Sequence, residues 1–64
     1  SSKEETIELK IKELCNCENF VKIDGDNIRV VLDSKDSNTS SANNIMRLVQ
    51  NEFDDKMYIS VKYN

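Results

Sequence analysis

Residues 20–32 read Phe-Val-Lys-Ile-Asp-Gly-Asp-Asn-Ile-Arg-Val-Val-Leu, two alternating segments around one turn signal. In the first segment Val21 and Ile23 alternate with polar residues, which is the period of a half-buried strand. Gly25, the only glycine of the chain, lies where a tight hairpin turn needs a positive φ. The alternation resumes over residues 28–32. The stretch therefore predicts a β-hairpin.

Apolar residues at helical spacing flank the hairpin on both sides. Residues 2–15 predict a helix, with Ser2 and Glu5 placed as in a capping box. Residues 34–41 are polar and predict a loop that ends in a helix cap. Residues 57–63 alternate again and predict a third strand. The second helix is predicted from the spacing of Ala42, Ile45, Met46, Val49 and Phe53.

The predicted order is αββαβ, one α+β domain over residues 1–64. Two helices are expected on one face of a three-stranded sheet, because both helices carry one apolar stripe that needs a partner layer. Such a two-layer domain has a thin core. The predicted core is Ile7, Ile11, Leu14, Val21, Ile23, Ile28, Val30, Leu32, Ile45, Met46, Val49, Phe53, Ile59 and Val61.

Composition narrows the function classes. The 64 residues carry a net charge of −3 and no histidine. The acidic balance argues against nucleic acid, because phosphate binding needs a basic surface. The missing histidine removes the commonest general base and metal ligand, so we expect neither an enzyme nor a cofactor. No apolar run approaches the length of a membrane span. The start at Ser1-Ser2 without methionine favours a fragment of a longer, membrane-anchored protein.

Two constellations suggest metal or redox chemistry. Cys15 and Cys17 read as a redox pair, as half a metal site, or as a packed small hydrophobe followed by a loop cysteine, and we favour the last. A calcium loop starting at Asp24 needs glycine at its sixth position and glutamate at its twelfth. Arg29 and Lys35 occupy those positions, so the turn interpretation is preferred and no metal site is expected.

The acidic pairs Glu4-Glu5 and Asp54-Asp55 fall at predicted helix ends. Catalytic carboxylates need a pocket that perturbs their pKa, and a two-layer domain of this size offers little depth for one. We interpret both pairs as charges that suit helix ends and solvent.

The alternation also assigns side chains to the outer face of the sheet. With Val21, Ile28, Val30 and Ile59 pointing inward, aromatic, aliphatic and basic residues point outward together. Such a mixture is typical of a protein-binding surface. The edges of the sheet offer a second route, by strand addition. The candidate partner-binding residues are Phe20, Lys22, Arg29, Val31, Tyr58 and Lys62.

Residues 20–32, the helix positions Ala42, Ile45, Met46 and Val49, and the strand Ile59-Ser60-Val61 resemble the stage III sporulation protein AH family. The resemblance extends from Ile7 to Tyr63. It implies a ring-building-motif fold, similar to ring components of type III secretion systems and of the flagellar base. Members usually carry a glycine just before the first strand, where this chain has Cys15-Asn16-Cys17.

The resemblance also implies a function. The family is anchored by one transmembrane helix in the mother-cell membrane around the forespore, with its soluble domain in the intermembrane space. That domain binds the extracellular domain of stage II sporulation protein Q to build an intercellular channel needed for engulfment and forespore development, and a homo-oligomeric ring is a further expectation. The alternatives are a ring-building domain of another secretion or flagellar basal apparatus, and a small ligand- or metal-binding module using Cys15 and Cys17.

Overall fold

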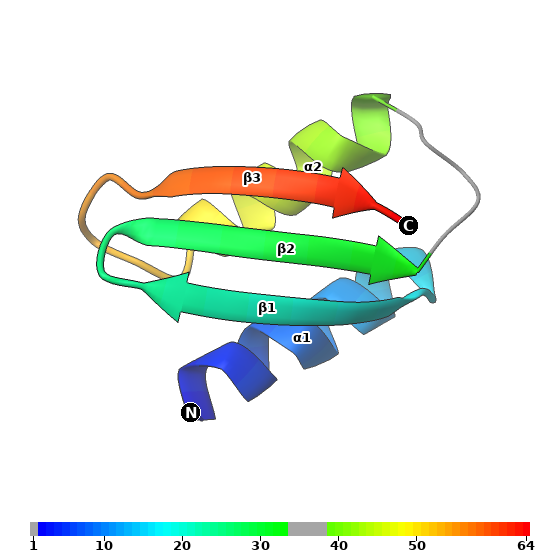
Figure 1. Cartoon of the computed structure of the whole chain (residues 1–64), viewed down its shortest axis with the longest axis horizontal. Coiled ribbons are helices and arrows are strands. Elements are labelled where there is room, and N and C mark those ends of the chain that lie inside the picture. The colour runs from blue at the N-terminus through cyan, green and yellow to red at the C-terminus, as the bar shows by residue number, and fades with distance from the viewer. Residues whose placement is uncertain (1, 34–38) are drawn as a thin grey trace.

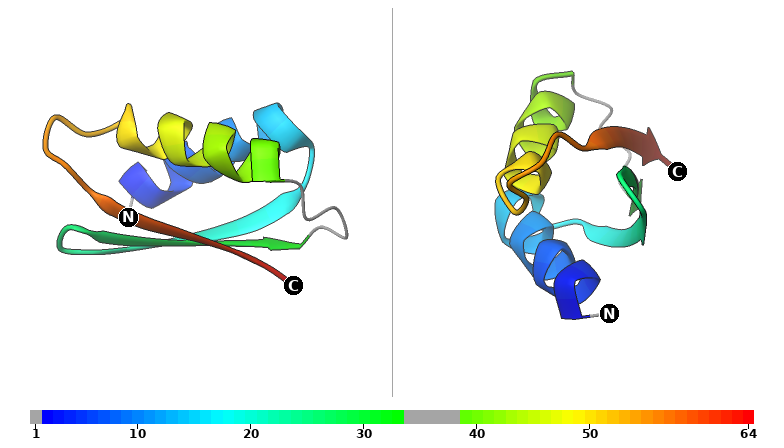
Figure 2. Two further views of the ribbon diagram at one scale, coloured as in Figure 1. Left: turned by 90° about the horizontal axis from the view of Figure 1, so that it is seen from above. Right: turned by 90° about the vertical axis from the view of Figure 1, so that its left-hand side faces the viewer.

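The computed structural model describes residues 2–33 and 39–64, with side chains for 2–33 and 42–64. The elements are α1 (Ser2–Cys15), β1 (Glu18–Asp24), β2 (Asn27–Asp33), α2 (Thr39–Gln50) and β3 (Tyr58–Tyr63). Two helices lie on one face of a three-stranded sheet (Figures 1 and 2). The predicted α+β class and αββαβ order are confirmed.

The sheet has the strand order β1-β2-β3. β1 and β2 pair antiparallel through the hairpin, whereas β2 and β3 pair parallel. A parallel neighbour needs a crossover connection, which α2 supplies. In Figure 1, α1 lies behind β1 and α2 behind β3, and the two helices also pack against each other. Within the described residues, the opposite face of the sheet therefore has no helix on it.

The hairpin turn has the predicted chemistry. Asp24 and Asn27 pair directly, which leaves Gly25 and Asp26 as a two-residue connection. Gly25 has a φ of 62°. A positive φ at the first central residue matches the right-handed twist of the two strands, and glycine adopts it without steric cost.

The core lies between the sheet and the helices. Most of its predicted members are fully buried, and Ile23, Phe53, Ile59 and Val61 are partly buried against them. Met57, which was not predicted to be in the core, is 7% exposed. The buried set is Ile7, Ile11, Val21, Ile28, Val30, Leu32, Ile45, Val49 and Met57.

Two predicted core positions are wrong. Leu14 is 49% exposed, because Cys15 continues the line of Ile7 and Ile11 at the end of α1 and packs against the core instead. On α2 the side chain that packs beside the buried residues is Leu48, and Met46 is half-buried outside the core cluster. Both errors have one cause, since a short apolar stripe does not say which of its flanks faces the sheet.

The bounds of α2 differ from the prediction at both ends. Thr39 already belongs to the helix, so the loop prediction is wrong for residues 39–41, while residues 34–38 lie outside the described part. The helix ends at Gln50 rather than Phe53. The N–H groups of Glu52 and Phe53 donate to carbonyls three residues earlier, at 3.0 Å each, which tightens the chain out of the α-helix.

Cys15 and Cys17, both partly buried against the core, form a disulfide, which the favoured interpretation of a packed cysteine and a loop cysteine did not include. The residue between them provides the reason. Asn16 has a φ of 53°, and its N–H donates to the Lys12 carbonyl at 2.8 Å, as in a left-handed helix C-cap. This conformation brings the two cysteine Cα atoms to 5.3 Å, within disulfide range.

Replacing Gly25 by alanine should destabilise the domain. No atom lies within 4 Å of an added Cβ, so the cost is the left-handed backbone alone. We expect a loss of about 1 kcal/mol in the free energy of unfolding. Urea denaturation measures it, with Gly25→Asn as the control because asparagine tolerates this conformation better. Equal stability of the alanine variant and the wild type would contradict this role of Gly25.

Candidate functional site

The structure brings all six candidate partner-binding residues to the open face, the side of the sheet that carries no helix. They form cross-strand rows. In one row Phe20 pairs with Val31 and Val31 with Lys62, and in the next Lys22 pairs with Arg29. Tyr58 pairs with Asn27, one row closer to the hairpin turn. Residues at these positions share one face because side chains alternate along a strand.

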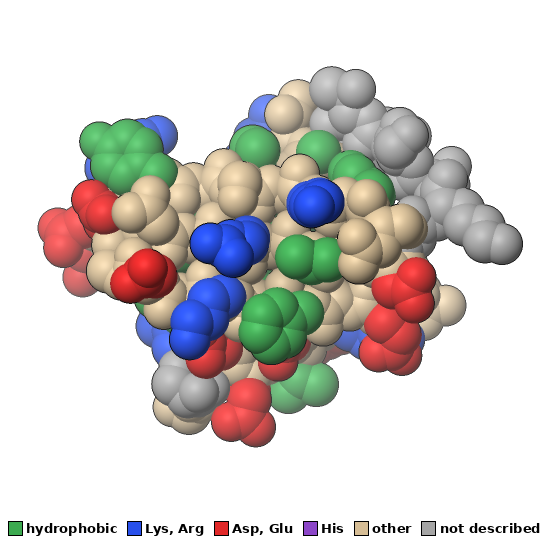
Figure 3. Space-filling view, viewed as in Figure 1, with side chains coloured by type: hydrophobic (Ala, Val, Ile, Leu, Met, Phe, Trp, Pro, Cys, Tyr) green, Lys and Arg blue, Asp and Glu red, His purple; other side chains and the backbone are tan. Residues whose placement is uncertain are grey.

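The aromatic members are unusually exposed for their size. Phe20 is 59% exposed and Tyr58 is 60% exposed. Figure 3 shows this face with green apolar side chains and blue basic side chains mixed across its middle and red acidic side chains toward both ends. The acidic ends follow from the register, since Glu18 pairs with Asp33 at one end of the hairpin and Asp24 precedes the turn at the other.

One pair on the open face is electrostatically unfavourable. Lys22 lies directly opposite Arg29, and both side chains are exposed. Like charges opposite each other on a sheet are destabilising. A partner that placed a carboxylate between them would relieve this repulsion, so the pair favours an acidic contact.

A shallow depression of about 720 Å³ lies beside this pair, toward the start of β3. Its lining includes the cations Lys22, Arg29 and Lys56 and the hydroxyl residues Tyr58 and Ser60. Asp24 also lines it. Because it is open to solvent and its lining is mainly charged and polar, the depression suits a side chain of a partner better than an enclosed small molecule.

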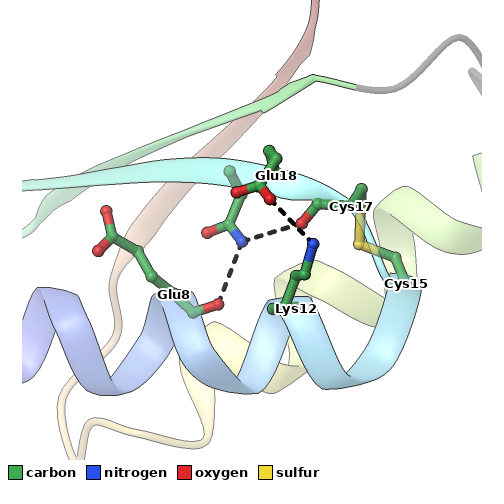
Figure 4. Close-up of a disulfide and its surroundings, with 6 residues drawn as sticks. Glu8, Lys12, Cys15, Cys17 and Glu18 are labelled. Carbon is green, nitrogen blue, oxygen red and sulfur yellow. Dashed lines mark hydrogen bonds and ion pairs between the residues drawn. A yellow bond between two sulfur atoms is a disulfide. The ribbon is translucent and has the colours of Figure 1, made fainter.

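The outer edge of β1 is closed by α1. The Val21 N–H donates to Glu8 Oε2 at 3.0 Å, and the Ile23 N–H donates to Glu4 Oε2 at 2.8 Å. The side-chain amide of Asn19 also donates, through Nδ2, to the backbone carbonyl of Glu8 at 3.1 Å. Four residues of helix rise about 6 Å and two residues of strand about 6.6 Å, so carboxylates one turn apart meet alternate amides. Figure 4 shows Glu8 reaching up to the strand.

The Ile23 N–H holds the pKa of Glu4 below its ordinary value of 4.5, because a hydrogen bond to the charged carboxylate stabilises that form. Sequence reasoning assigned Glu4 only to the helix end. The signal that points to the edge is the four-residue spacing of Glu4 and Glu8 beside the buried Ile7 and Ile11.

One ion pair and one cation–π contact connect α1 to the segment that follows α2. Lys10 Nζ lies 2.6 Å from Glu52 Oε2, and this hydrogen bond lowers the pKa of Glu52. Lys3 Nζ lies 5.3 Å from the centre of the Phe53 ring and donates to the Glu52 carbonyl at 3.0 Å. These contacts hold α1 against the segment that follows α2.

The described residues contain no group of three or more acidic, cysteine or histidine side chains arranged to hold a metal ion. The sulfurs of Cys15 and Cys17 are bonded to each other in this structure, a state in which neither offers a thiolate ligand. Neither described helix is long and apolar enough to cross a membrane.

Comparisons with known proteins add nothing to this geometry: the chain matches no protein-family model, no curated protein and no solved structure.

Glu4→Gln should make the free energy of unfolding depend less on pH in the acidic range. Glu4 has a lowered pKa in the folded state, so its charge stabilises the fold above the ordinary pKa of 4.5 and this contribution is lost as pH falls through the folded value. Glutamine keeps an acceptor oxygen but no charge. We expect lower stability than wild type at pH 7 and a smaller loss on acidification.

Urea denaturation between pH 7 and pH 3 measures both effects. Glu13→Gln is the matched control, because it removes one exposed carboxylate from the same helix. An equal change of slope in the two variants would contradict a specific role for Glu4.

Lys22→Glu should stabilise the isolated domain. The change places a carboxylate opposite Arg29, and an opposite-charge pair contributes roughly 0.5 kcal/mol relative to a neutral one. The gain should shrink in 1 M NaCl, because both side chains are exposed and salt screens them. Lys62→Glu is the control, since Lys62 pairs with the neutral Val31. A gain that is equal in both variants would contradict the repulsion between Lys22 and Arg29.

Proposed function

We propose that this domain is a non-enzymatic sporulation module that binds the extracellular domain of stage II sporulation protein Q. Its setting is the intermembrane space, with an anchor in the mother-cell membrane around the forespore. The two proteins together build the channel between mother cell and forespore that engulfment and forespore development need. The partner and the setting come from the family resemblance of residues 20–32 and the segments that follow.

The observation that carries a binding role is the open face. Exposed aromatic side chains and arginine are enriched where proteins bind one another. Here Phe20 and Tyr58 are both more than half exposed, and Arg29 lies between their rows. All three stand on paired strands, so their positions are set before a partner arrives and little ordering entropy is lost on binding.

The charge pattern of the open face favours one orientation of a bound partner. The basic residues Lys22, Arg29 and Lys62 lie in the middle rows, and acidic residues lie at both ends of the hairpin. A partner with an acidic centre is steered to one alignment, because the opposite charges at the ends penalise a shifted one. A ring of copies would need a further, head-to-tail contact between neighbouring domains.

Glu substitutions on the open face should weaken partner binding. Size-exclusion chromatography with light scattering is run on the domain alone and mixed with the extracellular domain of protein Q from the same organism. We expect a one-to-one complex with the wild type. Phe20→Glu and Tyr58→Glu should each weaken it by about tenfold or more, because a charge replaces a buried aromatic anchor.

Leu9→Glu is the matched control. Leu9 is 66% exposed and lies on α1, behind the sheet, so its substitution should leave the complex intact. A complex that survives both open-face substitutions would contradict this placement of the interface. Failure of the wild type to form a complex at roughly tens of micromolar, with both proteins folded, would favour a ring-building domain of another secretion or flagellar apparatus.

A further inference from the structure

The outer edge of β3 presents backbone donors without acceptors. The N–H groups of Tyr58 and Asn64 donate to β2 or its preceding turn, at 2.8 and 2.9 Å. Because alternate residues of a strand point to opposite sides, the N–H groups of Ile59 and Val61 point away from β2. Among the described residues none accepts a hydrogen bond from these two amides.

Comparison with β1 shows why this edge is open: α2 lacks the acceptor side chains that α1 provides. Gln50 on α2 accepts a hydrogen bond from the Met57 N–H at 2.9 Å, just before β3 begins. The next amide along this edge is that of Ile59, and the α2 residue one turn earlier is Met46. Methionine offers no comparable acceptor, whereas α1 carries Glu4 and Glu8 in the same relation to β1. The second helix therefore leaves the edge uncapped.

A groove of about 250 Å³ runs between α2 and this edge. We call it the β3 groove. Its apolar part is formed by Met46, Met57 and Ile59, and its cations are Arg47 and Lys56, both exposed. No acidic residue of the described chain lines it. The complete lining is Met46, Arg47, Gln50, Lys56, Met57 and Ile59.

Charge decides what fits this edge. A second copy cannot pair its β1 here, because α1 closes that edge. Pairing β3 with β3 of a second copy would bring the cations Arg47, Lys56 and Lys62 of both copies to one seam, which like-charge repulsion opposes. An acidic strand meets neither obstacle. Its backbone would pair with the edge, its inward side chains would enter the β3 groove, and its outward carboxylates would face Lys62.

We propose that β3 is a docking edge for an extended segment of a partner protein that alternates apolar and acidic residues. When the segment is added as a fourth strand, its backbone carbonyls accept hydrogen bonds from the N–H groups of Ile59 and Val61. This site adjoins the open face, with which it shares Lys62, and it does not depend on the identity of the partner proposed above. At this docking edge, backbone hydrogen bonds supply the affinity, and the β3 groove and the neighbouring cations select the sequence of the bound segment.

The test uses the ¹⁵N-labelled domain and the peptide acetyl-Glu-Val-Glu-Val-Glu-Val-Glu-amide. We expect chemical-shift changes along β3 and about tenfold slower hydrogen exchange at the amides of Ile59 and Val61 when the peptide is bound. The same peptide with lysine in place of glutamate should bind about tenfold more weakly or not at all.

Two protein variants distinguish the contribution of backbone hydrogen bonds to peptide binding from the contribution of charge. Val61→Pro removes an edge donor that makes no ladder bond, and proline is tolerated at such edge positions, so peptide binding should fall about tenfold while Val61→Thr retains it. Lys62→Glu removes the exposed cation that the outward carboxylates would face, so it should weaken binding of the glutamate peptide but not of the lysine peptide.

Three results would overturn the proposal. One is the absence of any shift along β3 at millimolar peptide. Another is equal binding of the glutamate and lysine peptides. The third is protection of Ile59 and Val61 that rises with protein concentration in the absence of peptide, which would identify a second copy as the occupant.

Discussion

Edge amides need acceptors, and in this domain the helices supply them on one side of the sheet only. Glu4 and Glu8 accept from the N–H groups of Ile23 and Val21, because one helical turn and two strand residues advance by nearly the same distance. This match aligns α1 along β1 and buries Ile7 and Ile11 beneath it. The position of the first helix, and so one half of the apolar layer, is set by these two hydrogen bonds together with the burial of Ile7 and Ile11.

The outer edge of β3 and the open face are the parts of the sheet that the described helices leave uncovered. The described residues form two helices, which cover one face of the three strands, and none of the described elements covers the other face. The consequence is a domain whose closed side is stabilised from within and whose exposed side carries Phe20, Tyr58 and the basic residues. Such a division between a packed back and a rigid exposed front suits a protein whose work is binding. The proposed sporulation role places a known class of partner on that front.

Much of the fold was predictable because its signals are local. The change of period at Phe20 and the single glycine indicate the hairpin, and the stripe of Ile7 and Ile11 indicates the first helix. The members of the open face follow from alternation alone. Leu14 and Met46 were wrongly assigned to the core, because the flank of a short stripe that faces the core depends on the neighbouring elements. The roles of the two edges depend on strand order, which local patterns do not contain.

Hydrogen exchange of individual amides in the isolated domain tests the central claim, the inequality of the two edges, most directly. NMR detection resolves Val21 and Ile23 on the closed edge from Ile59 and Val61 on the open one. We expect slow exchange at the first two and fast exchange at the second two, although all four belong to regular strands. Equal protection of both edges, or stronger protection of Ile59 and Val61, would contradict a sheet that is closed by α1 and open along β3.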